Sequence, residues 1–156
     1  MFGGIGVGVA ALYYVFNMRA TLQTRQAQLF MQSFNLWLWQ GYADKLVELL
    51  LTQQWSDFDD WREKYGGLKN PAGASAYFTL DTYFEGIGTL VKRKLIDPHL
   101  VDDLMGSDII MYWKKMRPVA EGLRKQEGLA TWAENSEYLY DEMRKIYREQ
   151  QPDVKI

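Results

Sequence analysis

Four acidic side chains, Asp57, Asp59, Asp60 and Glu63, form the densest group in the sequence that could carry out chemistry. Clustered carboxylates can bind a metal ion or transfer protons. A calcium-binding loop, however, requires Asp or Asn ligands at alternate positions, a central glycine and a later bidentate Glu, and this segment does not have that order. We therefore interpret the acids as residues of the first turn of a short helix, where the helix dipole stabilises negative charge.

Asp81 and Glu85 form a second pair of carboxylates, one helical turn apart on the most apolar helical segment of the chain. If this pair were buried, the pKa of a carboxyl would rise and the pair could be functional. The simpler interpretation, which we favour, places both side chains on a solvated face opposite the apolar seam of the helix.

Other catalytic chemistries lack the residues that they need. The chain contains no cysteine and one histidine, His99, which excludes thiol nucleophiles, cysteine-held zinc and iron–sulfur clusters. A di-iron bundle requires Glu-x-x-His on two helices, and no serine has a recognisable spacing to His99 for a catalytic triad. We therefore predict no catalytic residue, no cofactor and no metal site, and we predict that the protein is not an enzyme.

The length of the chain, 156 residues, corresponds to one domain, since a globular domain takes roughly 150 residues. Hydrophobic residues make up 47% of it and aromatic residues 15%, values that exclude a disordered chain. The net charge of -2 provides no general attraction to nucleic acid, so we predict no nucleic-acid partner.

The N-terminal stretch, residues 2–18, contains no charged side chain, and its one strongly polar residue is Asn17. A helix of this length is about 25 Å long, slightly less than the roughly 30 Å hydrocarbon core of a bilayer. Continuation to Leu22, with Arg19 reaching toward the headgroups, would complete the crossing. We therefore predict a transmembrane anchor over residues 1–22. A cleaved signal peptide fits less well, because no basic segment precedes the run, and a buried helix would contain fewer glycines.

Small residues repeat at four-residue spacing within this stretch, as Gly4 with Gly8 and Gly6 with Ala10. In membrane helices such a face allows a second helix to approach closely. We predict that these four residues form the packing face of the transmembrane helix.

Helical periodicity continues after the anchor, because apolar residues recur at three- and four-residue steps and no segment alternates as a strand does. The first helix is predicted to run without a break to Gly41, and a second helix is predicted over residues 42–54. The short acidic helix then begins at Ser56 and Asp57 and ends at Gly66.

Two pairs, Asn70-Pro71 and Asp97-Pro98, indicate an N-cap followed by the first helical residue. The helix after Pro71 is expected to bury an apolar seam. That seam consists of Tyr77, Leu80, Phe84, Ile87 and Val91. The second pair is predicted to begin a short helix that Gly106 ends.

The last two helices follow from similar signals. One is expected to begin at residues 107–108, to kink at Pro118, where a backbone hydrogen bond is lost, and to end at Gly128. Thr131 and Glu134 have the spacing of a capping box, which predicts the start of the final helix.

Tryptophans provide a candidate interaction surface, because aromatic side chains dominate the energetics of protein interfaces. We predict a partner surface formed by Trp37, Trp39, Trp55 and Trp61. The alternative is that these side chains belong to the core.

The short N-terminal span occurs in combination with five characteristic stretches of sequence. These stretches are residues 24–29, 57–60, 64–66, 83–88 and 95–97. This pattern resembles an uncharacterised prokaryotic family, domain of unknown function 4760, over residues 24–147. The resemblance implies a membrane-anchored helical domain, and it transfers no catalytic residue because the family has none established.

The sequence as a whole predicts an all-α protein, with a single N-terminal transmembrane helix that continues into a cytoplasmic helical bundle. The predicted parts are the anchor over residues 1–22, the bundle domain over 23–150 and a frayed tail over 151–156. Arg19 and Arg25 follow the span, which places the bundle in the cytoplasm according to the positive-inside rule.

We expect such a protein to be a non-catalytic accessory or scaffolding subunit of a larger membrane protein complex. Its expected partners are integral membrane protein subunits and the lipid bilayer. The alternative is a stand-alone signalling or regulatory module that is anchored in the membrane and homo-oligomerises.

Overall fold

The protein is all-helical over the residues that the computed structural model describes, which are 3–39, 41–67 and 70–152. The side chains of residues 3–6 and 36–39 are not part of this description. The elements are α1 (Gly3–Trp39), α2 (Tyr42–Val47), the π-helix η1 (Glu48–Thr52), α3 (Phe58–Tyr65), α4 (Pro71–Lys92), α5 (Pro98–Gln126) and α6 (Glu134–Gln150). The predicted all-α class is therefore confirmed.

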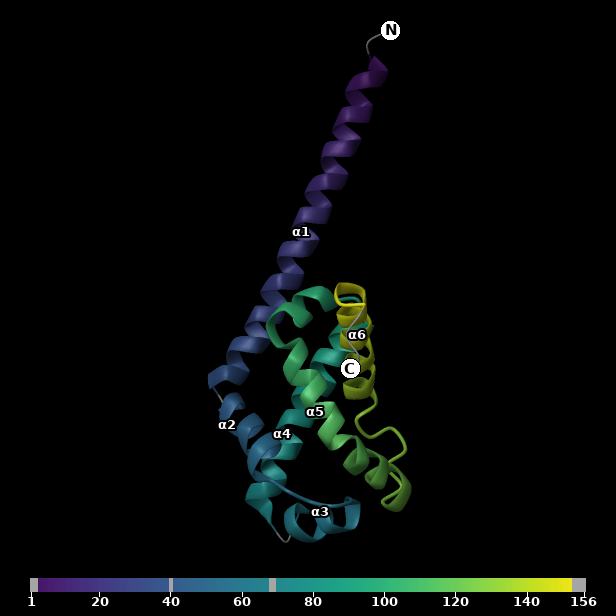
Figure 1. The fold of residues 1–156 in the computed structure, drawn as a ribbon. Helices are drawn as coiled ribbons and strands as arrows, with labels where there is room; N and C mark the ends of the chain where they lie inside the picture. The colour runs from purple at the N-terminus through teal and green to yellow at the C-terminus, as the bar shows by residue number, and fades with distance from the viewer. Residues whose placement is uncertain (1–2, 40, 68–69, 153–156) are drawn as a thin grey trace.

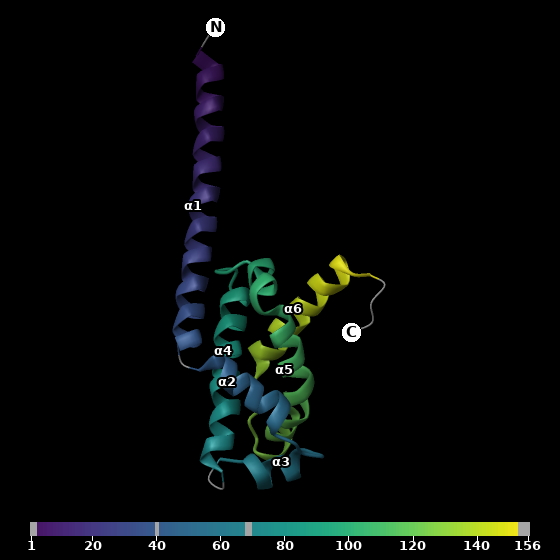
Figure 2. The same ribbon diagram turned by 60° about the vertical axis from the view of Figure 1, so that its left-hand side comes forward.

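Helix α1 projects far beyond the other helices, which form a bundle beside its C-terminal part (Figure 1). Its 37 residues make it about 55 Å long. Figure 2, turned by 60°, shows the same free N-terminal half and the helices α4, α5 and α6 lying together. Helix α1 joins the bundle near Phe30, which is fully buried, and through Gln26, whose Nε2 donates to the carbonyl of Lys94 at 3.1 Å.

The predicted transmembrane anchor is not supported by this structure. None of the helices in the described part of the chain has the length and apolar character needed to cross a membrane. Met1 and Phe2, which belong to the predicted span, lie outside the described residues.

Predicted start and stop signals determine most of the observed helix ends. Three of the predicted N-cap side chains accept a hydrogen bond from a backbone N–H in the first turn. These bonds join Asp57 to Asp60, Asn70 to Gly73 and Asp97 to His99, at 2.9, 2.9 and 3.0 Å. Gly41 and Gly128 have φ angles of 75° and 70°, a left-handed conformation that glycine adopts without strain, and they lie just beyond the ends of α1 and α5.

Helix α5 consists of two helical parts that meet at a kink, close to the predicted boundary at Gly106. The torsion angles of Met105, with φ of -150° and ψ of 16°, are not helical. Gly106 lies so close to the carboxylate of Asp102 that a Cβ atom there would overlap it. The glycine therefore allows the chain to bend where the first part ends. Pro118 lies inside α5, and the recorded break in helical torsion is at Met105 rather than at this proline.

The core lies between α4, α5 and α6. The predicted seam of α4 is confirmed, because Tyr77, Leu80, Phe84, Ile87 and Val91 are all buried. They pack with Tyr112, Trp113 and Met116 from α5 and with Leu139, Met143 and Ile146 from α6.

Helices α4 and α6 approach each other closely at Gly88. A Cβ atom at this position would overlap the backbone carbonyl of Asn135, at the start of α6. Backbone cannot move aside as a flexible side chain can, so the absence of a side chain at Gly88 sets the distance between these helices.

The substitution Gly88→Ala is therefore expected to lower the free energy of unfolding by about 2–3 kcal/mol, because α6 must move away from α4. Gly86→Ala is the matched control on the same helix, since a Cβ there meets nothing within 4 Å; it should stabilise the protein by about 0.4–1 kcal/mol. Denaturant unfolding of both variants measures the difference. Equal effects of the two substitutions would contradict this account of the helix contact.

Candidate functional site

The two carboxylates on α4 lie at the α4–α6 contact, so the interpretation of a solvated face is wrong. Asp81 is 5% exposed. Its Oδ1 accepts hydrogen bonds from the Tyr112 hydroxyl at 3.1 Å and the Ser136 hydroxyl at 3.5 Å. Helices α4, α5 and α6 thus each contribute one polar group to a buried cluster.

Burial changes the acid–base behaviour of this cluster. Removal from water and the negative charge of Glu85 raise the pKa of Asp81 to about 7, and the bonds from Tyr112 and Ser136, with the charge of Arg124, oppose that rise only in part. Burial also raises the pKa of Tyr112. Asp81 therefore changes its charge near neutral pH.

Glu85 caps the N-terminus of α6. Its Oε1 accepts from the backbone N–H groups of Asn135 and Ser136, both at 2.7 Å, and its Oε2 accepts from Nδ2 of Asn135 at 3.0 Å. A carboxylate at this position satisfies N–H groups that have no partner within the helix and also interacts favourably with the dipole.

The predicted capping box is consequently wrong. The N-cap position of α6 is Ala133, in the left-handed conformation with φ of 55°, and it has no side-chain cap. Thr131 contributes only its backbone carbonyl, which accepts from the N–H of Glu134 at 3.3 Å. The acceptor that replaces its hydroxyl comes from another helix.

An open pocket of about 620 Å³ lies between α4 and the loop that precedes α6. Asp81, Thr82 and Glu85 line one side, and residues 128–133 line the other. The loop is fixed at Trp132, whose Nε1 donates to the Tyr77 hydroxyl at 2.5 Å and whose carbonyl accepts from Nε of Arg124 at 2.8 Å.

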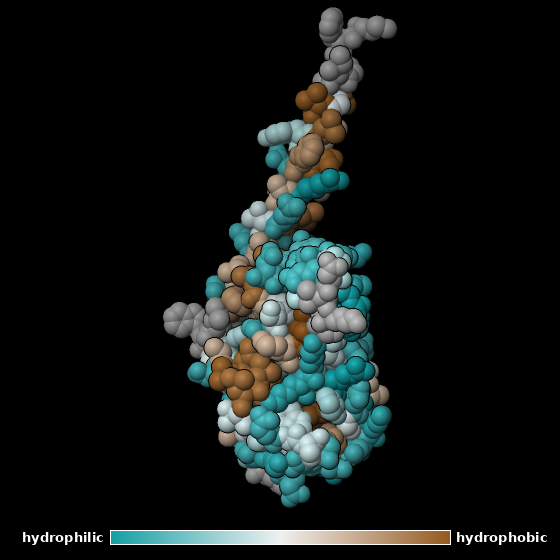
Figure 3. Space-filling view, viewed as in Figure 1, coloured by the Kyte–Doolittle hydropathy of each residue, from teal (hydrophilic) through white to brown (hydrophobic). Residues whose placement is uncertain are grey.

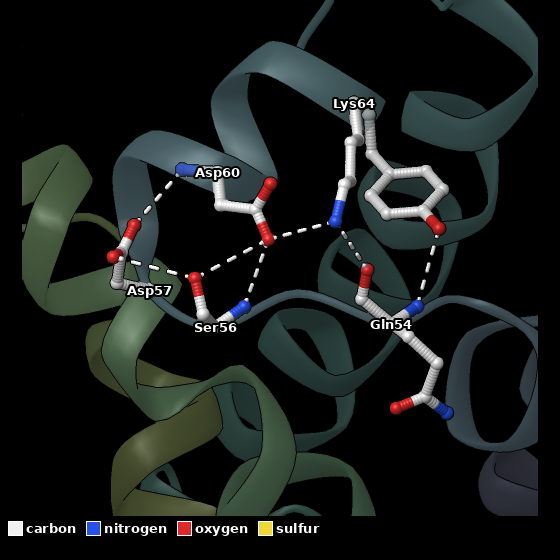
Figure 4. A network of polar contacts seen from close by, with 6 residues as sticks. Gln54, Ser56, Asp57, Asp60 and Lys64 are labelled. Carbon is white, nitrogen blue, oxygen red and sulfur yellow. Dashed lines mark hydrogen bonds and ion pairs between the residues drawn. The ribbon is translucent and has the colours of Figure 1, made fainter.

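Of the acidic group at the start of α3, Asp57 is the N-cap residue, in agreement with the capping interpretation. Figure 4 shows Asp57, Asp60 and Lys64 in one network with Ser56 and Gln54. Asp60 Oδ2 accepts from the backbone N–H of Ser56 and from Lys64 Nζ, both at 2.9 Å; the bond from Lys64 is the largest cause that lowers the pKa of Asp60. Among the described residues, no group of three or more His, Cys, Asp and Glu side chains could hold a metal ion.

The predicted tryptophan surface is wrong at Trp61, which is 2% exposed and packs edge-on against Tyr77 with ring centroids 5.3 Å apart. Trp55 is half-buried, and the ammonium of Lys115 lies 4.7 Å from its ring centroid. The side chains of Trp37 and Trp39 lie outside the described residues.

The glycine face predicted on α1 is described at two of its four positions. Ala10 is exposed, and a Cβ at Gly8 would meet nothing within 4 Å, so no part of the described chain packs on this face at either position. The side-chain environments of Gly4 and Gly6 are outside the description.

Large apolar side chains on the same part of α1 are also exposed. They are Val7, Val9, Leu12, Tyr13, Tyr14, Val15, Phe16, Met18 and Leu22. Their exposed fractions run from 45% at Val15 to 72% at Val7. This apolar segment, residues 7–22 of α1, is the second candidate site of the molecule.

Comparison with known proteins identifies the family. The family model described as a domain of unknown function (DUF4760) matches residues 2–143, and the chain belongs to this family. No curated protein and no solved structure matches the chain.

Removal of the carboxylate that caps α6 tests its contribution directly. Glu85→Ala should lower the free energy of unfolding by about 2–4 kcal/mol, because two backbone N–H groups and one amide lose a charged acceptor. Thr131→Ala, which alters the residue that the sequence pattern favours as the cap, should change it by less than about 0.5 kcal/mol. Denaturant unfolding compares the two, and a larger loss for Thr131→Ala would show that the local capping box is used.

Asp81 should make stability depend on pH. Its pKa is about 7 in the folded state against an ordinary value of 3.8. The contribution of Asp81 to the free energy of unfolding is therefore complete below pH 4 and is lost as the pH rises through 7. The loss corresponds to about 4 kcal/mol. Asp81→Asn, which resembles the neutral acid, should be more stable than wild type at pH 8 and similar to it at pH 4. Unfolding curves at both pH values measure this, and a constant difference between the proteins would contradict it.

Proposed function

Since the family to which the chain belongs is described without an activity, we propose that the protein is a non-catalytic accessory or scaffolding subunit of a membrane protein complex. The apolar segment of α1 holds it there. The observation that carries the proposal is the exposure of this apolar segment on a helix that projects from the bundle (Figure 3).

The number and placement of these side chains favour an interaction site. Single exposed apolar residues are common on protein surfaces, whereas a contiguous apolar surface marks a place where a partner or a membrane binds. Burial of one large apolar side chain contributes about 1.5–3 kcal/mol. The apolar segment contains nine such side chains, so covering it provides ample energy for stable attachment.

A membrane complex suits the composition of the segment better than a single helix surrounded by lipid. Small residues such as Gly8 and Ala10 allow another helix to approach closely. Neighbouring subunits can also accept the hydrogen bonds of Asn17, which lipid cannot do. Arg19 lies near the C-terminal end of the apolar segment and Arg25 follows it, and both favour a cytoplasmic position for the bundle.

The bundle then serves as the part held beside the membrane. On the face in Figure 3 most of its surface is hydrophilic, and hydrophobic residues gather again near α2 and η1. Val47 and Leu51, at 53% and 72% exposed, belong to that region. It offers a second contact for a partner that already binds α1.

The alternative function, a signalling or regulatory module that homo-oligomerises, uses the same segment in another way. In that case the exposed face of α1 packs against the α1 helix of a second copy. The two functions therefore differ in the composition of the assembly and can be separated by measuring it.

Extraction from native membranes in mild detergent, through a C-terminal tag, is expected to recover the protein with larger integral subunits in fixed stoichiometry. The double variant Leu12→Arg/Phe16→Arg should lose at least about 90% of this association, because two large apolar groups can no longer be buried. Leu104→Arg is the control, since Leu104 is an exposed apolar residue of the bundle, and it should remain associated.

Native mass and mass spectrometry provide the measurement, and circular dichroism checks that the variants are folded. Recovery of wild type as a monomer overturns the proposal. Recovery as a homo-oligomer that the double variant converts to monomers supports the alternative function.

A further inference from the structure

We propose that the pocket between α4 and residues 128–133 binds the ammonium group of a small organic amine, with Asp81 as its negatively charged partner. This inference concerns the bundle and is independent of how α1 is attached. It rests on the free oxygen of Asp81, on the charges around the pocket and on the chemistry of the pocket walls.

The first observation is the state of the Asp81 carboxylate. Asp81 is only 5% exposed, and it lines the pocket. Its Oδ1 receives both recorded hydrogen bonds, from Tyr112 and Ser136. Within the described contacts Oδ2 accepts none, so one oxygen of a buried carboxylate remains available to a ligand in the pocket.

The second observation is the balance of charge. Asp81 and Glu85 both line the pocket, and its remaining lining residues, Thr82 and residues 128–133, include no Lys, Arg or His. The nearby guanidinium of Arg124 donates to the Trp132 carbonyl and forms an ion pair with Glu137 at 2.8 Å. Asp81 forms no ion pair within the described chain, and a cationic ligand would supply the missing positive charge.

The pKa of Asp81 agrees with this geometry. Removal from water and the charge of Glu85 raise it, and the bonds from Tyr112 and Ser136 and the charge of Arg124 lower it only in part. The titratable and charged groups around it are Tyr77 and Glu85 of α4 and Tyr112 and Arg124 of α5, and α6 contributes the hydroxyl of Ser136. A bound ammonium group would stabilise the ionised carboxylate, so amine binding should strengthen as the pH rises from 6 to 8.

The chemistry of the walls favours an organic amine over a metal ion. The oxygens of Glu85 already accept hydrogen bonds from Asn135 and Ser136, which leaves a single free carboxylate oxygen, fewer ligands than a metal ion needs. Trp132, Leu129 and alanines on the loop side provide apolar and aromatic surface for the carbon part of a ligand. The volume of about 620 Å³ lies within the usual range for small-molecule sites.

Benzylamine is a suitable probe, because it combines one ammonium group with an aromatic ring. Benzyl alcohol is the neutral control of nearly the same size. Chemical-shift titration of the full-length protein in detergent at pH 8 should give saturable benzylamine binding, with shifts centred on Trp132 and Ser136. Benzyl alcohol should bind more weakly than benzylamine by a factor of about ten or greater, because it lacks the charge.

Asp81→Asn should weaken benzylamine binding about tenfold or more and remove its dependence on pH, while the variant remains folded. Asp103→Asn is the matched control, since Asp103 is an exposed acid on α5, and it should leave binding unchanged. Equal binding of benzylamine and benzyl alcohol, undiminished binding by Asp81→Asn, or no saturable binding of benzylamine would each overturn the proposal.

Discussion

The contact between the Glu85 carboxylate and the N-terminus of α6 is the interaction on which the rest of the bundle depends. Helix α6 has no side-chain cap of its own, and its first N–H groups would lack acceptors in a partly buried position. Glu85 provides those acceptors from α4, and Gly88, one turn later, lets the two backbones approach closely enough. The carboxylate of Glu85 and the absence of a side chain at Gly88 together determine where α6 lies.

The position of α6 in turn creates the buried polar cluster and the pocket. Ser136, in the first turn of α6, brings its hydroxyl to Asp81, and the loop before it is held by Trp132 and Arg124. Asp81 is thus enclosed by three helices and forms no ion pair within the described residues, and its pKa rises. The same packing that stabilises the bundle therefore disfavours the charged form of Asp81, and a nearby positive charge would stabilise that form.

Helix α1 differs from the helices of the bundle, because its N-terminal half projects away from them (Figure 2). Its burial begins at Phe30, and the exposed residues before it are more apolar than an isolated solvated helix requires. The sequence pattern predicted a membrane anchor in this segment. None of the helices in the described residues has the length and apolar character of a membrane span.

The sequence by itself determined the helical class, the buried seam of α4 and the helix starts at Asp57, Asn70 and Asp97, because capping and helical periodicity act between residues a few positions apart. Tertiary structure decided the start of α6, the burial of Asp81 and the placement of Trp61 in the core. The bonds from Asn135 and Ser136 to Glu85 join residues 50 and 51 positions apart. Such an acceptor competes with the local Thr131 hydroxyl only after α4 and α6 have packed, so no short sequence pattern could indicate it.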